Sequence, residues 1–234
     1  PKAIVFIYTL DIEIENEEQV LARFESNLRL SPSPDTSYHF VAHAPETRLT
    51  HRPIIVGMGP AGLFAGLILA QSGFRPIILE RGKAVRERTK DTFGLWREGI
   101  LDPESNVQFG EGGAGTFSDG KLHTQIKDRK HYGRKVLEEL VKAGAPPEIM
   151  YVSKPHIGTY KLVGILEKMR ANILALGGEI RFQSRADDID VEDGQVRGVV
   201  LANGECIATM HLIAAIGHSA RDTFEMFHRR GIYM

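Results

Sequence analysis

The sequence is poor in cysteine, in long apolar runs and in charge of one sign, and each shortage excludes a class of protein. Its 234 residues contain a single cysteine, Cys206, so the chain alone forms neither a disulfide framework nor a two-cysteine redox pair. No apolar run reaches the roughly 18 residues that a membrane-spanning helix needs. Lys and Arg number 29 against 30 Asp and Glu, without a basic block, which argues against a nucleic-acid surface.

Further absences set the expected location and extent of the chain. No signal peptide is visible, so the cytoplasm is the expected location and no membrane partner is expected. No spacing of His, Cys and Asp suggests a metal site. The chain begins at Pro1 without a Met and ends at Met234, soon after a strand and the start of a helix. We therefore expect a fragment that is trimmed at both ends.

The first 50 residues predict a small α+β segment followed by a linker. Residues 3–15 are rich in β-branched side chains, which predicts a strand, and residues 17–28 carry apolar side chains at helical spacing. Residues 31–50 are rich in Ser, Pro, Thr and His and are interpreted as a linker. We place a domain boundary close to residue 50, so that the second domain covers residues 51–234.

The second domain begins with a strand, a helix and a strand within about 30 residues, which predicts a parallel sheet. Helices are predicted at 60–72, 131–143 and 158–176, strands at 53–56, 76–80, 179–183, 186–191, 195–201, 205–208 and 212–216, and loops over most of 82–130. Asp193-Gly194 and Asn203-Gly204 supply the positive φ of tight hairpins, so the strands between 186 and 208 form a β-meander. The predicted fold class is α/β, a Rossmann-like parallel sheet with a β-meander.

The segment Gly57-Met58-Gly59-Pro60-Ala61-Gly62 follows a predicted strand and opens a helix, the context in which spaced glycines indicate a dinucleotide site. Gly57 permits the tight turn, Gly59 lets the backbone approach a pyrophosphate, and Gly62 lets the helix pack close to the strand. The helix N-terminus then offers N–H groups and a partial positive charge to the phosphates.

Glu80 ends the second strand of this unit, where an acid accepts hydrogen bonds from the ribose hydroxyls of an adenosine. It also repels a 2′-phosphate, so FAD or NAD is favoured over NADP. The alternative is a glycine-rich turn followed by an ordinary surface glutamate. The agreement of three glycines, two strands and the acid favours the nucleotide site.

A second glycine cluster, Gly110 to Lys121, lies in the long stretch after the second strand. Consecutive small residues expose backbone amides to a ligand, and in this place such a loop is suited to pass along a flavin ring. The alternative is a flexible surface loop, but long loops inside compact domains are usually functional or disordered.

Other candidates are weaker. The strand end Ala215-Ile216-Gly217 lies where ligands gather in parallel sheets, although a plain strand-to-loop glycine is an equal alternative. The candidate acid–base groups are His123, His156 and His218, each of which is more often a loop or packing histidine.

On five segments the sequence resembles the bacterial uncharacterised FAD-dependent dehydrogenase family, within the glutathione-reductase-like flavoprotein superfamily. The segments are 57–65 (GMGPAGLFA), 79–82 (LERG), 106–122 (NVQFGEGGAGTFSDGKL), 154–159 (KPHIGT) and 215–226 (AIGHSARDTFEM). The resemblance runs from about residue 3 to residue 231, and the long glycine segment is its most specific part.

The resemblance implies a non-covalent FAD. Its pyrophosphate would be held by Gly57, Gly59, Pro60, Ala61 and Gly62. Glu80 would bind the adenosine ribose with Arg81 beside it, and the backbone of Ala186 would pair with adenine. The flavin or its ribityl chain would be faced by Gly112, Gly113, Ala114, Gly115 and Thr116. Ala215 and Gly217 match the superfamily's strand-end motif.

Two departures from the family pattern stand out. The family usually has Asp after His-Ile-Gly-Thr, whereas this chain has Tyr160. The family's chain also continues well past residue 234, so that the FAD-binding domain of residues 51–234 is expected to be incomplete and the substrate domain missing.

The expected function is that of an FAD-dependent oxidoreductase that transfers hydride to or from an unidentified small molecule, with NAD(P)H as an open candidate for electron donor. Lys121 and Ser118 are the candidate catalytic residues, since a lysine there would stabilise negative charge on a reduced ring. A solvated loop lysine is an equal alternative. Two other functions stay open: a truncated FAD- or nucleotide-binding module without turnover, and a flavin-dependent RNA-modifying enzyme, against which the near-zero net charge counts.

Overall fold

The computed structural model describes residues 5, 7–47, 49–118, 120–122, 124 and 126–234. The chain divides into two compact units, residues 1–37 and 38–234. In the described part of the first unit the helix α1 (Glu17–Arg23) has no buried residue. The strand predicted over 3–15 is wrong for the described residues 5 and 7–14, because no described segment pairs with them.

Residues 38–50 belong to the second unit, although the proposed boundary lies near residue 50. The Ala44 N–H donates to the Ser72 carbonyl (2.8 Å) just after the helix α2 (Pro60–Gln71). The Lys135 ammonium lies 5.4 Å from the ring centroids of Tyr38 and Phe40. These contacts tie the stretch to the larger unit. The assignment of two domains itself stays a prediction.

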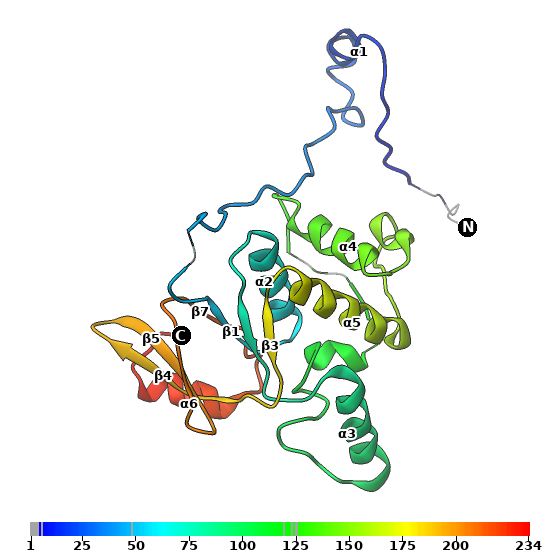
Figure 1. Cartoon of the computed structure of the whole chain (residues 1–234). Coiled ribbons are helices and arrows are strands. Elements are labelled where there is room, and N and C mark those ends of the chain that lie inside the picture. The colour runs from blue at the N-terminus through cyan, green and yellow to red at the C-terminus, as the bar shows by residue number, and fades with distance from the viewer. Residues whose placement is uncertain (1–4, 6, 48, 119, 123, 125) are drawn as a thin grey trace. The chain divides into compact units, whose positions relative to one another are not determined.

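A four-stranded parallel sheet lies at the centre of the second unit (Figure 1). Its strands, in spatial order, are β3 (Glu179–Arg181), β2 (Ile77–Leu79), β1 (Ile54–Val56) and β7 (Leu212–Ala214). The strand pairs are in register, with Ile55 between Ile78 and Ile213. The predicted Rossmann-like sheet is confirmed.

Both faces of the sheet are covered, which is why its central strands are apolar throughout. Because alternate residues of a strand point to opposite faces, Ile55 and Ile78 pack on one side against α2 and α5 (Thr159–Ala175). On the other side, Ile54 and Leu79 pack against Val199 of the antiparallel sheet. Figure 1 shows this layering.

The antiparallel sheet is the predicted β-meander. Its strands are β4 (Ala186–Glu192), β5 (Gln195–Leu201) and β6 (Cys206–Ala208). The first hairpin turns at Asp193 and Gly194, which both have positive φ (51° and 74°), as its turn type requires. The helix α6 (Arg221–Arg229) packs on β4 through Met226 and Phe227, which contact Ile189.

The stretch 82–130 is more regular than predicted, since it contains the helix α3 (Val85–Glu98) and the short 3₁₀ helix η1 (Gly113–Phe117). The buried residues of α3 are Val85, Arg88 and Thr92, spaced three and four apart on one face. Because two of these three residues are polar, the buried face of α3 has no helical repeat of apolar residues that could be recognised in the sequence.

The helices predicted at 131–143 and 158–176 are present as α4 (Tyr132–Lys142) and α5. The short 3₁₀ helix η2 (Pro147–Met150) between them was not predicted. No helix in the described ranges is long and apolar enough to cross a membrane.

Candidate functional site

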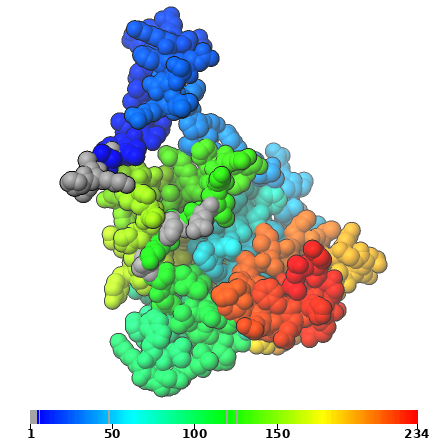
Figure 2. All heavy atoms as spheres, turned by 180° about the vertical axis from the view of Figure 1, so that it is seen from behind, coloured from blue at the N-terminus to red at the C-terminus, as the bar shows by residue number. Residues whose placement is uncertain are grey.

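A cavity of about 540 Å³ opens at the carboxyl ends of β1, β2 and β7. Its walls come from the turn after β1, the end of β2, the second glycine cluster, the start of β4 and the segment from β7 to α6. In Figure 2 the cyan atoms of the β1–α2 region lie next to the orange atoms of the C-terminal segment. Ligands of open parallel sheets bind at this edge, and the volume is typical of small-molecule sites.

The three glycines of the first motif have different surroundings. Gly57 has φ +99°, and a Cβ there would lie 2.4 Å from the Ala215 carbonyl oxygen. A Cβ at Gly62 would lie 1.9 Å from the Gly57 carbonyl oxygen. At Gly59, by contrast, the nearest atom is the Gly113 Cα at 3.7 Å. Gly57 and Gly62 therefore let protein pack on protein, whereas Gly59 leaves space on the cavity side.

The N-terminus of α2 faces the cavity without a capping side chain. Gly59 is the N-cap residue in extended conformation, Pro60 occupies the first helical position, and no described side chain caps the helix. Gly59, Pro60 and Ala61 line the cavity. The unpaired N–H groups and the dipole of the first turn favour an anion at this place.

Glu80 is buried, with 4% of its surface exposed, and its carboxylate joins three segments around the cavity. One oxygen accepts the Met58 N–H (2.7 Å), and the other accepts the N–H groups of Gly82 (2.8 Å) and Gly110 (2.9 Å). A carboxylate accepts about four hydrogen bonds, so one acceptor position of Glu80 is left. The sequence predicts the residue but not its backbone partners.

The second glycine cluster lies directly on the first. The Gly112 N–H donates to the Met58 carbonyl (2.8 Å), and a Cβ at Gly113 would lie 2.9 Å from the Gly59 Cα. Gly113, Ala114 and Gly115 line the cavity. Neither Gly112 nor Thr116 lines it, although both were predicted to face a flavin.

Arg88 contacts the loop that carries this cluster, and it was not predicted as a site residue from the sequence. Its side chain is fully buried and donates to the carbonyls of Asn106 (2.8 Å), Val107 (2.8 Å) and Glu111 (2.7 Å). A further N–H reaches the Thr116 hydroxyl (3.2 Å). Burial lowers the pKa of Arg88 to about 10, so the guanidinium stays charged at neutral pH.

Glu111 is a second fully buried ionisable residue of the cluster. One carboxylate oxygen accepts the Val85 N–H (2.7 Å) and a guanidinium N–H of Arg170 (2.7 Å). Burial raises the pKa of this carboxyl, partly offset by the hydrogen bond from Val85 and the charge of Arg170. Together with Arg88, it fixes the loop whose other face lines the cavity.

Arg81 and Ala186 both line the cavity, and the Arg81 guanidinium makes four hydrogen bonds to two carboxylates. It donates to Glu104 (2.8 and 3.0 Å) and to Asp222 (3.0 and 2.9 Å). Burial opposes its charge, but the hydrogen bonds to both carboxylates outweigh burial and raise the pKa of Arg81. The sequence predicted Arg81 and Ala186 as site residues, but neither Glu104 nor Asp222.

The other predicted site residues divide into two groups. Residues on the cavity wall include Ala215, Gly217 and His218, while Gly62 lies behind it. Ser118 and Lys121 do not line it: the Ser118 hydroxyl donates to the Gly115 carbonyl (2.7 Å), and Lys121 forms an isolated β-bridge with His156. His123 and Asp119, which belongs to the second cluster, lie outside the described residues.

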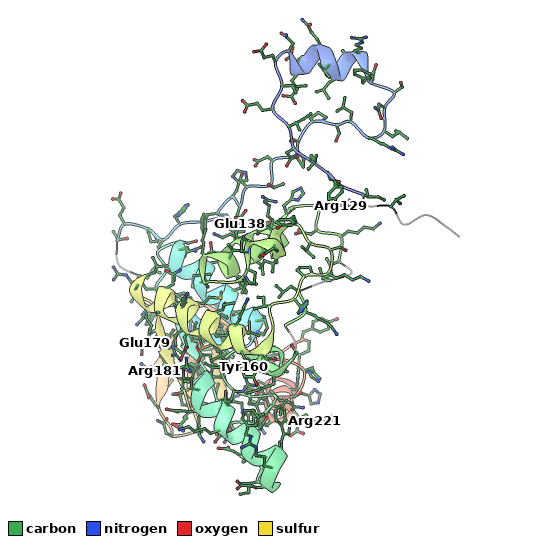
Figure 3. All side chains as sticks on the ribbon, turned by 90° about the vertical axis from the view of Figure 1, so that its right-hand side faces the viewer. Arg129, Glu138, Tyr160, Glu179, Arg181 and Arg221 are labelled. Atoms are coloured by element: carbon green, nitrogen blue, oxygen red, sulfur yellow. The ribbon has the colours of Figure 1, made fainter. Side chains whose placement is uncertain are left out.

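Tyr160, which replaces the family's Asp, is 96% exposed at the start of α5 (Figure 3) and is not part of the cavity wall. Within the described ranges, no group of three or more His, Cys, Asp and Glu side chains could hold a metal ion.

Comparison with known proteins supports the fold and leaves the family open. No protein-family model matches the sequence. An uncharacterized protein of Clostridium beijerinckii is 52% identical over 183 residues, which are 78% of this chain and 34% of the relative. The chain therefore spans about a third of the length of this curated relative.

Solved structures of similar fold share little sequence with the chain. THI4 from Thermovibrio ammonificans has a TM-score of 0.50 and 20% identity, covering 78% of this chain and 64% of that one. Glycine oxidase from Bacillus cereus has a TM-score of 0.41 and 15% identity, covering 77% of this chain and 60% of that one. The THI4 likeness supports the Rossmann-like fold alone.

Proposed function

We propose that the chain binds FAD non-covalently in the 540 Å³ cavity and is the cofactor-binding part of a flavin-dependent oxidoreductase. The observation that carries the proposal is the convergence of three features on one cavity. These are the uncapped N-terminus of α2, the buried Glu80 carboxylate and the amide-rich wall from Gly113 to Gly115.

The residues present fit this cofactor. Gly59 and Ala61 would hold the pyrophosphate, because the wall at Gly59 has no side chain and the first N–H groups of α2 open on the same space. Glu80 has one acceptor position left for the adenosine ribose. Gly113 to Gly115 would support the flavin end. When bound, FAD supplies hydride-transfer chemistry, and the protein supplies position and electrostatics.

A nucleotide-binding module without turnover is the second candidate, and one observation favours it. Ser118 and Lys121, the two residues proposed for catalysis, do not line the cavity. His218 is an ionisable side chain on the cavity wall, and its Nε2 lies 3.3 Å from the Ser219 hydroxyl.

The test is the absorbance spectrum of the purified chain after addition of excess FAD and desalting. We expect retained peaks near roughly 370 and 450 nm, because a bound isoalloxazine absorbs there and a bound nicotinamide does not. Bleaching by NADH or NADPH would then favour the oxidoreductase, and retained but unreduced flavin would favour the binding module. A folded sample that retains no flavin would contradict the cofactor assignment.

A matched pair of variants locates the site. Gly59→Leu fills space on the cavity side, whereas Gly94→Leu in α3 enters open space away from the cavity, with no atom within 4 Å of its Cβ position. We expect the first variant to lose FAD and the second to retain it, at similar thermal stability. Equal retention by both would place the flavin elsewhere.

A further inference from the structure

Besides Glu80, the proposed adenosine end of the cavity contains two arginines and the carboxylates paired with them. Arg81 follows Glu80 directly, at the place where a dinucleotide-binding protein that accepts a 2′-phosphate needs a free arginine. Here both edges of its guanidinium are bound, four hydrogen bonds running to Glu104 and Asp222. The Phe109 ring lies 4.2 Å from its central carbon and covers one face of the guanidinium.

Arg185, the second arginine of this wall, is bound in the same way. It donates to Glu104 (2.8 Å) and to Asp187 (2.5 Å). The two guanidinium groups pair with three carboxylates, those of Glu104, Asp222 and Asp187, so the net charge of this cluster is negative. Burial opposes ionisation of Glu104, but its hydrogen bonds to the two arginines lower its pKa, and the group stays ionised at neutral pH.

A nearby lysine does not change this balance. Lys83 lies beside Arg81 and Arg185 on an adjoining hollow and is itself paired with Asp91 (2.9 Å) and Asp102 (3.1 Å). A 2′-phosphate adds close to two negative charges. To reach Arg81 it would have to displace the carboxylate of Glu104 or Asp222. A 2′-hydroxyl needs only an acceptor, which Glu80 provides.

We propose that Glu104 and Asp222 are specificity-determining residues that occupy Arg81, so that the cavity accepts an adenosine ribose with a free 2′-hydroxyl and rejects one with a 2′-phosphate. The inference rests on the proposed nucleotide site. It adds two acids, neither of them part of the two glycine clusters, to the residues that select the ligand. It also implies that NADPH does not enter this cavity.

The experiment measures how well ADP-ribose and 2′-phospho-ADP-ribose displace FAD from the whole chain, followed by flavin fluorescence. These probes differ only in the 2′-phosphate. For the wild type we expect ADP-ribose to compete about tenfold or more better. For the isosteric double variant Glu104→Gln/Asp222→Asn we expect this ratio to fall about tenfold, because 2′-phospho-ADP-ribose binds more tightly once Arg81 is free. The control Asp190→Asn/Glu192→Gln, which removes the same charge from exposed positions of β4, should leave the ratio unchanged.

The outcomes separate the two proposals. If neither FAD nor ADP-ribose binds the wild type, the proposed nucleotide site is wrong. If FAD and ADP-ribose bind but the wild type takes both probes equally well, the site stands and the selectivity is wrong. An unchanged ratio in a folded double variant, judged by its thermal transition, would assign the selectivity to Glu80 alone. Single variants at Glu104 and Asp222 provide the same comparison if the double variant does not fold.

Discussion

At the scale of single residues, the effect of replacing a helical glycine by alanine depends on which atoms the added methyl group would contact. Gly62 and Gly164 both lie inside helices, α2 and α5. A Cβ at Gly62 would lie 1.9 Å from the Gly57 carbonyl oxygen and 2.9 Å from its carbon, both backbone atoms that cannot rotate away. At Gly164 no atom lies within 4 Å. The same substitution therefore has opposite expected effects on stability.

We predict that Gly62→Ala lowers the free energy of unfolding by about 3 kcal/mol or more, because the helix must move off the strand. Gly164→Ala should raise it by roughly 0.5–1 kcal/mol, since alanine is the better helix former and no contact opposes it. Urea unfolding of both variants measures the difference. Comparable stability of the two variants would show that the β1–α2 turn has room for a methyl group at position 62.

At the scale of elements, α3 supports the cavity wall through one buried cation. Arg88 donates hydrogen bonds to three backbone carbonyls of the loop between α3 and η1. The centroid of the Phe117 ring lies 4.9 Å from its guanidinium carbon. A lysine keeps the charge but lacks the fork of N–H groups, so carbonyls inside the protein would lose their donors.

We predict that Arg88→Lys lowers the free energy of unfolding by about 3 kcal/mol, at about 1–3 kcal/mol for each buried group left unsatisfied, and weakens FAD retention. Arg86→Lys is the matched control, because Arg86 lies on the same helix in an exposed pair with Glu167 and should change little. Thermal unfolding and flavin retention are measured together. A folded, flavin-retaining Arg88→Lys protein would remove Arg88 from its supporting role.

The elements that the sequence predicted are those whose signal is local. β1 and β2 are short apolar runs next to turn glycines, and the β-meander is marked by its Asp-Gly and Asn-Gly turns. The helix α3 was not predicted, because its buried face contains Arg88 and Thr92 in place of apolar residues. The contact between the two glycine clusters and the pairing of Arg81 with Asp222, 141 positions away, have no local pattern at all. Local motifs therefore predicted many of the residues on the cavity wall, but not the acids and the arginine around it. Predicted site residues that do not line the cavity include Gly62, Gly112, Thr116, Ser118 and Lys121.

At the scale of the whole molecule, carboxylates in ion pairs set the response to acid. The groups whose pKa is lowered by hydrogen bonds and charges of Arg and Lys, despite some burial, are Asp102, Glu104, Glu139, Glu167, Glu179, Asp188 and Asp222. They lie in α4, α5, β3, β4, α6 and the loop around residue 104, so their protonation affects many parts of the second unit. Glu111, with its raised pKa, acts in the opposite direction and is a single group.

The sign of the pH dependence follows from linkage. A carboxyl whose pKa is lower in the folded state contributes its full stability above its unfolded pKa, near 4, and loses it as the pH falls through the folded value. We therefore predict a urea midpoint that is nearly constant from about pH 7 to pH 5 and falls steeply below about pH 4. A midpoint at pH 3 equal to that at pH 7 would contradict this origin of acid stability.

Glu139 offers the sharpest test of this effect. Its side chain is buried in α4 and accepts hydrogen bonds from Lys135 and Lys142 (both 2.8 Å). Glu139→Gln should lower the midpoint at pH 7 and flatten its fall below pH 4, because one of the titrating groups is gone. Glu138→Gln is the control, since this neighbour (Figure 3) lies in a more exposed pair with Arg134. Equal acid sensitivity of both variants and the wild type would show that the dependence arises from the remaining carboxylates alone.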